Sequence, residues 1–114
     1  MFIPTKTKGD SFDITITIGE DITNWKIRCE IYDSTHKIQL ASANSGGSND
    51  EIEIIVITQG KFQIHVAKNL TTNFKDKSNI EVEVETDDSP SKKYTVIQEE
   101  IRFKNERINW DTPE

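Results

Sequence analysis

Apolar and polar residues alternate one by one in short runs along this chain, and no other feature of the sequence limits its fold as strongly. In residues 12–18, Phe12 and three isoleucines alternate with aspartate and threonines. Successive side chains of a strand point to opposite faces of a sheet, so this period of two predicts a strand with one buried face. Similar runs occur at residues 25–32, 37–43, 51–58, 61–66, 80–85 and 92–104. The chain is therefore expected to be all-β, with about seven strands.

Turn-forming residues separate these runs, and no intervening segment carries an apolar stripe with the period of a helix. Residues 69–79 include Thr71 and Thr72, either of which suits the cap of a helical turn, but the segment is expected to be a connector. Gly, Asn, Asp and Ser gather at residues 19–21, 44–50 and 87–91. Short strands with turns at this spacing are typical of a single Ig-like antiparallel β-sandwich.

The alternation breaks once, at Ile54-Ile55 in the run 51–58. Such a break fits either a strand buried on both faces or a β-bulge, and the sequence leaves both alternatives open. Gln59-Gly60 follows as a turn signal, so this run is expected to form a hairpin with residues 61–66.

The 114 residues are enough for one hydrophobic core and too few for two. Only 33% of them are apolar and 30% are charged, yet the apolar residues are concentrated in the strand runs, as in a thin two-layer β protein. We expect a β-sandwich domain over residues 1–104. Residues 105–114 have lost the alternation and are expected to be either a tail or a docking arm.

The charge balance argues against some partners. The net charge of −6 would repel phosphate backbones and anionic membranes, so neither nucleic acid nor a membrane is expected as a partner. The sequence begins without a basic segment followed by a long apolar stretch, which predicts neither a secretory signal nor a transmembrane helix. Cys29 is the single cysteine, so no internal disulfide is expected.

The residues that carry catalysis or bind metals do not form a recognisable pattern. His36 and His65 have no Cys, Asp or second His at ligand spacing, so no metal site is expected and both are predicted to face solvent. Cys29 shares the phase of Trp25 and Ile27, which predicts a small buried hydrophobe and not a nucleophile. There is no phosphate-binding loop, nucleophile elbow or dinucleotide fingerprint. We expect no cofactor and no enzymatic activity.

Two acidic patterns also favour structural roles. Glu81, Glu83 and Glu85 project from one face of a strand, where a solvated face that discourages edge pairing explains them better than a calcium site. Glu99 and Glu100 are adjacent in a strand and point to opposite faces, so they are not a catalytic carboxylate pair.

Six short motifs spread along the chain carry a family resemblance: Lys8-Gly9-Asp10-Ser11-Phe12, Trp25-Lys26-Ile27-Arg28, Gly60-Lys61-Phe62-Gln63-Ile64, Thr71-Thr72-Asn73-Phe74, Ile80-Glu81-Val82-Glu83-Val84 and Tyr94-Thr95-Val96. With them the chain resembles small Ig-like domains encoded in phage and prophage structural operons, of which the N-terminal domain of the baseplate upper protein family is the nearest. Two departures are that Ser78-Asn79-Ile80 stands where such domains often have Gly-x-Tyr, and that Asn109-Trp110-Asp111 has no counterpart.

The resemblance implies a structural or adaptor protein of a phage tail or baseplate that is assembled in the bacterial cytoplasm and becomes part of the virion. Its expected partners are other phage structural proteins, and a homo-oligomer is a further expectation. Ile108 and Trp110 are the candidate contact residues, because tryptophan is favoured as an interface anchor. Trp110 folded back over the end of the sandwich is the competing interpretation.

A carbohydrate- or ligand-binding module is the alternative function, because β-sandwiches are common hosts for such sites and exposed aromatic rings stack on sugars. The aromatic candidates are Trp25, Tyr32, Tyr94 and Trp110, although Trp25 lies in the phase of the core.

Overall fold

The structure is a computed structural model that describes residues 3–105, and it is all-β. Seven strands match the runs expected from the alternation and an eighth precedes them. The strands are β1 (Lys6–Thr7), β2 (Phe12–Thr17), β3 (Lys26–Tyr32), β4 (Lys37–Ala41), β5 (Ile52–Val56), β6 (Lys61–Val66), β7 (Lys77–Glu85) and β8 (Lys93–Lys104). Two three-residue 3-10 helices, η1 (Ala43–Ser45) and η2 (Ile57–Gln59), flank β5. Over the described range, no helix has the length and apolar character needed to cross a membrane.

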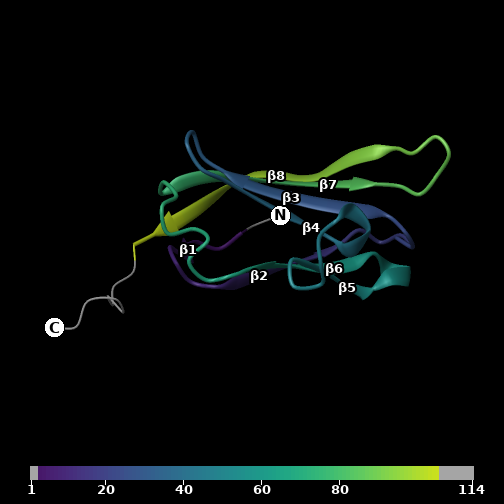
Figure 1. The fold of residues 1–114 in the computed structure, drawn as a ribbon, viewed down its shortest axis with the longest axis horizontal. Coiled ribbons are helices and arrows are strands. Elements are labelled where there is room, and N and C mark those ends of the chain that lie inside the picture. The colour runs from purple at the N-terminus through teal and green to yellow at the C-terminus, as the bar shows by residue number, and fades with distance from the viewer. Residues whose placement is uncertain (1–2, 106–114) are drawn as a thin grey trace.

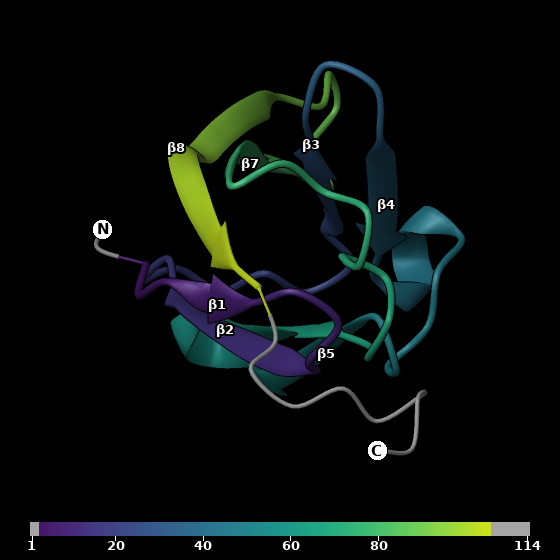
Figure 2. The ribbon, with the colours of Figure 1, turned by 90° about the vertical axis from the view of Figure 1, so that its left-hand side faces the viewer.

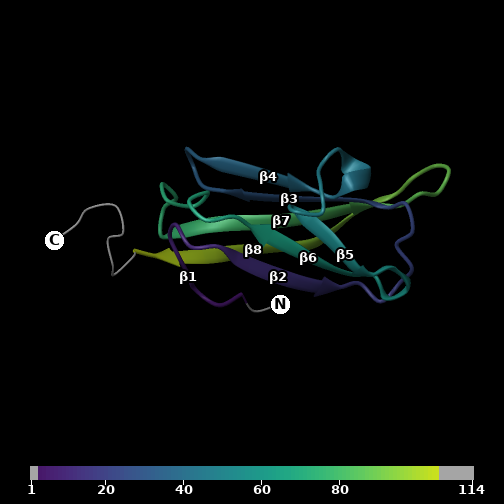
Figure 3. The ribbon, with the colours of Figure 1, turned by 60° about the horizontal axis from the view of Figure 1, so that its bottom comes forward.

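The strands form two sheets that lie over one another (Figures 1 and 3). Sheet A has the strand order β1-β8-β7-β3-β4, and sheet B has the order β2-β6-β5. Neighbours are antiparallel, except that β1 runs parallel to β8 with Lys6 opposite Phe103. The expectation of about seven antiparallel strands was therefore wrong in two respects. The described residues form eight strands, and β1 and β8 run parallel. A two-residue strand is too short to show an alternation in sequence, so only its pairing with β8 reveals it.

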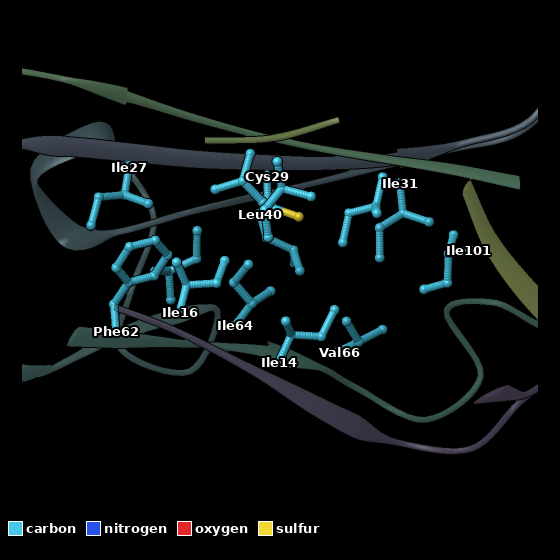
Figure 4. Packing of buried hydrophobic residues seen from close by; sticks show 14 of the residues in the cluster. Ile14, Ile16, Ile27, Cys29, Ile31, Leu40, Phe62, Ile64, Val66 and Ile101 are labelled. Carbon is cyan, nitrogen blue, oxygen red and sulfur yellow. The ribbon is translucent and has the colours of Figure 1, made fainter. Parts of the chain in front are cut away.

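The core lies between the two sheets. Figure 4 shows Phe62, Ile64 and Ile14 of sheet B pointing toward Ile27 and Cys29 of sheet A. These positions are the apolar members of the alternating runs, and all are buried, Phe62 with no exposed surface. The one-sided burial that the sequence predicted is thus confirmed for β2, β3 and β6.

Sheet A curls at one end so that the last residues of β8 reach sheet B (Figure 2). There the ring of Phe103 lies 6.3 Å from Phe12 and 5.8 Å from Phe74. Lys6 of β1 places its ammonium 5.1 Å from the centroid of the Phe12 ring, within the range of a cation–π contact. Aromatic packing among the start of β2, the end of β8 and the connector before β7 therefore closes this end of the core.

Both sheets contain a bulge. In sheet B the pairing of β5 with β6 shifts between Ile54 and Val56, and the side chain of Ile55 is 43% exposed. A bulge, not burial on both faces, therefore explains the broken alternation. In sheet A the pairing of β7 with β8 shifts between Val82 and Glu83.

The connector between β6 and β7 is shorter than the sequence suggested, because β7 begins at Lys77 and not at residue 80. Ser78 is buried, and its hydroxyl donates to the carbonyl of Lys75, 3.0 Å away. A buried polar residue at an inward position hides the start of the strand from a hydropathy pattern. The rest of the connector consists of turns, as expected, and packs Thr71 and Phe74 into the core.

Candidate functional site

A groove of about 460 Å³ lies on the outer face of sheet A. Three neighbouring strands form its floor, with β3 between β7 and β4, and the short helix η1 forms one wall. Side chains at alternate positions of these strands point away from the core and into the groove. They are Arg28, Glu30, Gln39, Glu81 and Glu83. Ser45 of η1, with Cys29, Leu40 and Ala41 of the strands, completes the lining.

The strand register decides which charges meet in the groove. Arg28 lies opposite Glu83, while Glu30 lies directly opposite Glu81. Carboxylates that face each other across strands repel, so this pair favours a bound cationic group that would lie between them. Gln39 donates a hydrogen bond to Glu30 over 3.0 Å. Within residues 3–105, Arg28 makes no ion pair shorter than 4.0 Å, so its guanidinium keeps its donors for other groups.

Ser45 contributes an unusual feature to the groove wall. Its hydroxyl oxygen is buried and has no hydrogen-bond partner in the part of the chain that the structure describes. Buried polar atoms without a partner are uncommon and costly, and a bound water or ion is a common explanation. The groove therefore combines unpaired charges with an unsatisfied hydroxyl.

The segment between β4 and β5 fixes the position of Ser45. A side-chain oxygen of Glu51 accepts a hydrogen bond from the backbone of Ala41 over 3.1 Å, and the Ser48 amide donates to the Ala41 carbonyl over 3.2 Å. Gly47 lies so close to Ala41 that any side chain would collide with its carbonyl. The segment is thus fastened to the edge of β4.

The groove offers hydrogen bonds and charge but no obvious nucleophile. Cys29 lies in the strand beneath it, yet its side chain points into the core and is 2% exposed. Burial, with a smaller contribution from the charge of Glu30, raises the pKa of the Cys29 thiol to about 12, so it stays protonated at neutral pH. The expectation that Cys29 is a buried hydrophobe is confirmed. Among residues 3–105, no group of three or more His, Cys, Asp or Glu side chains is arranged to hold a metal ion.

A second polar cluster lies on the outer face of sheet B and centres on His65 of β6. One ring nitrogen lies 2.7 Å from a carboxylate oxygen of Asp13 on β2, and the other lies 3.0 Å from Glu53 on β5. His65 thus links all three strands of the sheet, and its side chain is only 26% exposed. The hydrogen bonds that the ring donates to the carboxylates of Asp13 and Glu53 raise the pKa of His65, because both carboxylates stabilise the protonated ring.

Replacement of His65 by glutamine is expected to cost more stability in acid than in alkali. The pKa of His65 is higher in the folded than in the unfolded chain, so its stabilising effect is complete below the unfolded value of about 6.5. The effect is lost as the pH rises through the raised folded value, because the neutral ring cannot donate from both nitrogens. Urea denaturation of both proteins at several pH values measures the difference. A difference that stays constant or grows with rising pH contradicts the prediction.

The turn between β3 and β4 is organised by Asp33. Its side chain is 1% exposed and accepts hydrogen bonds from the backbone amides of Thr35, His36 and Lys75. Burial alone would raise the pKa of the carboxyl, but these three donors, together with the nearby ring of His36, hold it well below its ordinary value. Asp33 therefore ties this turn to the connector before β7, which is a structural role.

The residues singled out from the sequence fall in different places. His36 is 43% exposed, as predicted, whereas His65 lies between two carboxylates that no sequence pattern pairs with it. Glu81 and Glu83 line the groove, and Glu85 pairs instead with Lys26 and Lys93 at 3.9 and 3.7 Å. Ile108 and Trp110 lie outside the described residues.

Sequence reasoning missed both the groove and the His65 cluster. Alternating charged residues in residues 26–32 and 79–85 are visible in the sequence, and they indicate two polar strand faces. That these faces adjoin depends on the pairing of β3 with β7. No family model, curated protein sequence or solved structure matches this chain.

Proposed function

We propose that this chain is a non-enzymatic structural or adaptor protein that acts through protein–protein contacts. Its place would be a phage or prophage tail or baseplate, as the sequence resemblance implies. The observation that supports this most is a pair of exposed apolar side chains at one end of sheet B. Ile55 and Ile57 are 43% and 41% exposed, and Ile55 is the residue that the bulge in β5 leaves without a partner across from β6. Bulges are frequent beside functional sites, and neighbouring exposed apolar side chains are typical of contact surfaces.

The proposal includes an Ig-like sandwich as the framework. Two sheets around one core support it, as does the order in which the chain visits them. After β2 in sheet B, the chain enters sheet A for β3 and β4, returns for β5 and β6, and ends in β7 and β8 of sheet A. Repeated crossing between facing sheets is the pattern of Ig-like and related sandwiches.

The contact residues proposed from the sequence are Ile108 and Trp110, in the docking arm that follows β8. Trp110→Ala is expected to weaken binding to the product of an adjacent structural gene by about ten-fold or more, because tryptophan anchors dominate binding energy. Titration calorimetry with the purified partner measures the change. Tyr94→Ala is the matched control, because Tyr94 is 48% exposed on β8 and is not proposed as a contact to another protein. Unchanged binding by Trp110→Ala contradicts the arm, and absence of the chain from purified particles contradicts the proposed location.

A carbohydrate- or ligand-binding module is the second candidate, favoured by the groove with its buried, partnerless Ser45 hydroxyl. Among residues 3–105 no aromatic side chain lines that groove, so a sugar there would be held by hydrogen bonds without ring stacking. A glycan array probed with the wild-type chain and with Glu81→Gln tests this candidate. Hits that disappear in the variant support the groove, and an array without hits removes the carbohydrate candidate.

A further inference from the structure

The free strand edges of the two sheets are not equally protected. An exposed edge presents unpaired backbone N–H and C=O groups, so proteins discourage unwanted pairing there with short strands, bulges, inward-pointing charges or covering loops. Here the ends of the sheets are formed by β1 and β4 in sheet A and by β2 and β5 in sheet B. Three of these four strand edges carry such protection.

On the side formed by β4 and β5, the connecting segment covers the edges. It runs from one sheet to the other beside the two strands (Figure 2). The outward amide of Ala41 donates to the Glu51 carboxylate and its carbonyl accepts from the Ser48 amide, and the bulge at Ile55 distorts β5. A further strand would have to displace this segment to pair here.

The edge of sheet A near β8 is also protected. β1 covers Phe103 and Lys104, and a bulge interrupts β8 further along. Glu99 lies opposite the buried Ile80, so it occupies an inward-facing position of the strand. A charged residue at such a position opposes the burial that pairing with another sheet edge would bring.

β2 has none of these features. It is six residues long, contains no bulge, Lys or Pro, and consists mainly of isoleucine and threonine, which favour strands. It forms one margin of sheet B (Figure 3), and within residues 3–105 it pairs with β6 alone. β1 pairs with β8 and, among residues 3–105, makes no strand pairing with β2.

The hydrogen-bond pattern shows which backbone groups of β2 are free. The Ile18 amide donates to Gly60 over 3.0 Å, so residues of the same phase direct their backbone groups toward β6. Asp13, Thr15 and Thr17 have the opposite phase and direct theirs outward. Their side chains are exposed on the outer face of sheet B.

We propose that β2 pairs antiparallel with β2 of a second copy of this chain, across a two-fold axis at Thr15. The two copies of sheet B then form one continuous sheet of six strands. A two-fold interface brings the same surface of both copies together, so it requires a strand that is complementary to itself.

β2 meets that requirement in this register. With Thr15 opposite its own copy, Ile14 faces Ile16 and Phe12 faces Ile18, so every inward pair is apolar. On the outer face Thr15 faces Thr15, a favourable pair. No two like charges face each other along the strand.

Charge also fits this register. Asp13 of one copy lies opposite Thr17 of the other, and the next residue across the sheet is Lys61. The side chain of Lys61 is long enough to extend past Thr17 toward Asp13 of the second copy, which lies two strands away. Asp13 is therefore placed beside a basic residue of the second copy and far from its own counterpart.

Light scattering on the full chain tests the proposal. The wild type is expected to have twice the mass of one chain at high concentration, and Thr15→Lys the mass of one chain, because it places two ammonium groups opposite each other. Thr95→Lys is the matched control at the edge of β8, where the new lysine would face Glu83, and it should leave the dimer intact. Circular dichroism checks that each variant is folded. A wild type that is monomeric at its highest soluble concentration, or a folded Thr15→Lys that still dimerises, overturns the proposal.

Cysteine cross-linking tests the register without weakening the interface. In Thr15→Cys the two new thiols face each other in a hydrogen-bonded pair, whose Cα separation of about 5.5 Å suits a disulfide. In Thr17→Cys they lie about 13 Å apart along the strands and should not react. With oxidised glutathione as oxidant, Thr15→Cys is expected to give a covalent dimer and Thr17→Cys none. The native Cys29 is buried and does not interfere. Equal cross-linking of the two variants, or none in either, overturns the register.

The proposed dimer does not depend on the docking arm. Truncation of the arm distinguishes a contact through β2 from a contact through the arm. A version of the chain that ends at Lys104 keeps β2, so it should still dimerise. If dimerisation is lost on truncation and not in Thr15→Lys, the arm and not β2 forms the contact between copies.

Discussion

Phe62→Ala is expected to lower the free energy of unfolding by about 3–5 kcal/mol, a large part of the total stability of a domain this size. Phe62 has no exposed surface and lies opposite Ile16 on one side and Ile54 on the other. Its ring points from sheet B toward Ile27 of sheet A (Figure 4). Removal of the ring leaves a cavity between two sheets whose positions are set by many other contacts, so little of the space can close.

Urea denaturation followed by circular dichroism measures the loss. Ile55→Ala is the matched control, because the side chain of Ile55 is 43% exposed and its removal should cost about 0.5 kcal/mol or less. If the two substitutions cost the same, Phe62 is not in the centre of a packed core and the arrangement of the two sheets is wrong.

Gly47→Ala is expected to destabilise the chain by about 1–3 kcal/mol, although it adds one methyl group at a surface segment. A Cβ at this position would lie 1.9 Å from the carbonyl oxygen of Ala41 and 2.5 Å from its carbonyl carbon. The atoms in the way belong to the backbone of β4, which pairs with β3, so relief requires the segment to move away from the edge. That movement breaks the 2.9 Å hydrogen bond from the Gly47 amide to Ser42.

The neighbouring glycine gives the control. Gly46 has a φ of 88°, and a Cβ added there would meet nothing within 4 Å. Gly46→Asn should therefore be tolerated, since asparagine accepts the left-handed conformation. Thermal unfolding of both variants measures the contrast. A Gly47→Ala protein as stable as the wild type would show that the segment between β4 and β5 does not lie against the strand edge.

The alternation in the sequence predicted the seven longer strands and their buried faces. Ile14, Ile27 and Cys29 are buried as expected, because the period of two is a local property of an extended backbone. It holds whichever strand lies alongside, so it can be recognised without knowledge of the partners.

The alternation did not predict β1, the bulge in β8 or the start of β7, and its break at Ile54-Ile55 left a bulge as one of two alternatives. β1 exists only because Lys6 and Thr7 lie beside the end of β8, and the bulges are set where two strands fall out of register. β1 and the bulge in β8 depend on how two strands pair, so a pattern within one segment carries no sign of them.

The candidate sites also combine features that are local in sequence with features that depend on strand pairing. By itself the sequence determined that Arg28, Glu81 and His65 stand on polar strand faces. Only the tertiary structure decided that β3 lies beside β7, which forms the groove, and that His65 lies between Asp13 and Glu53, which are 52 and 12 residues away from it. The physical reason is that the face a side chain takes follows from the local backbone, whereas its neighbours follow from the packing of the whole core.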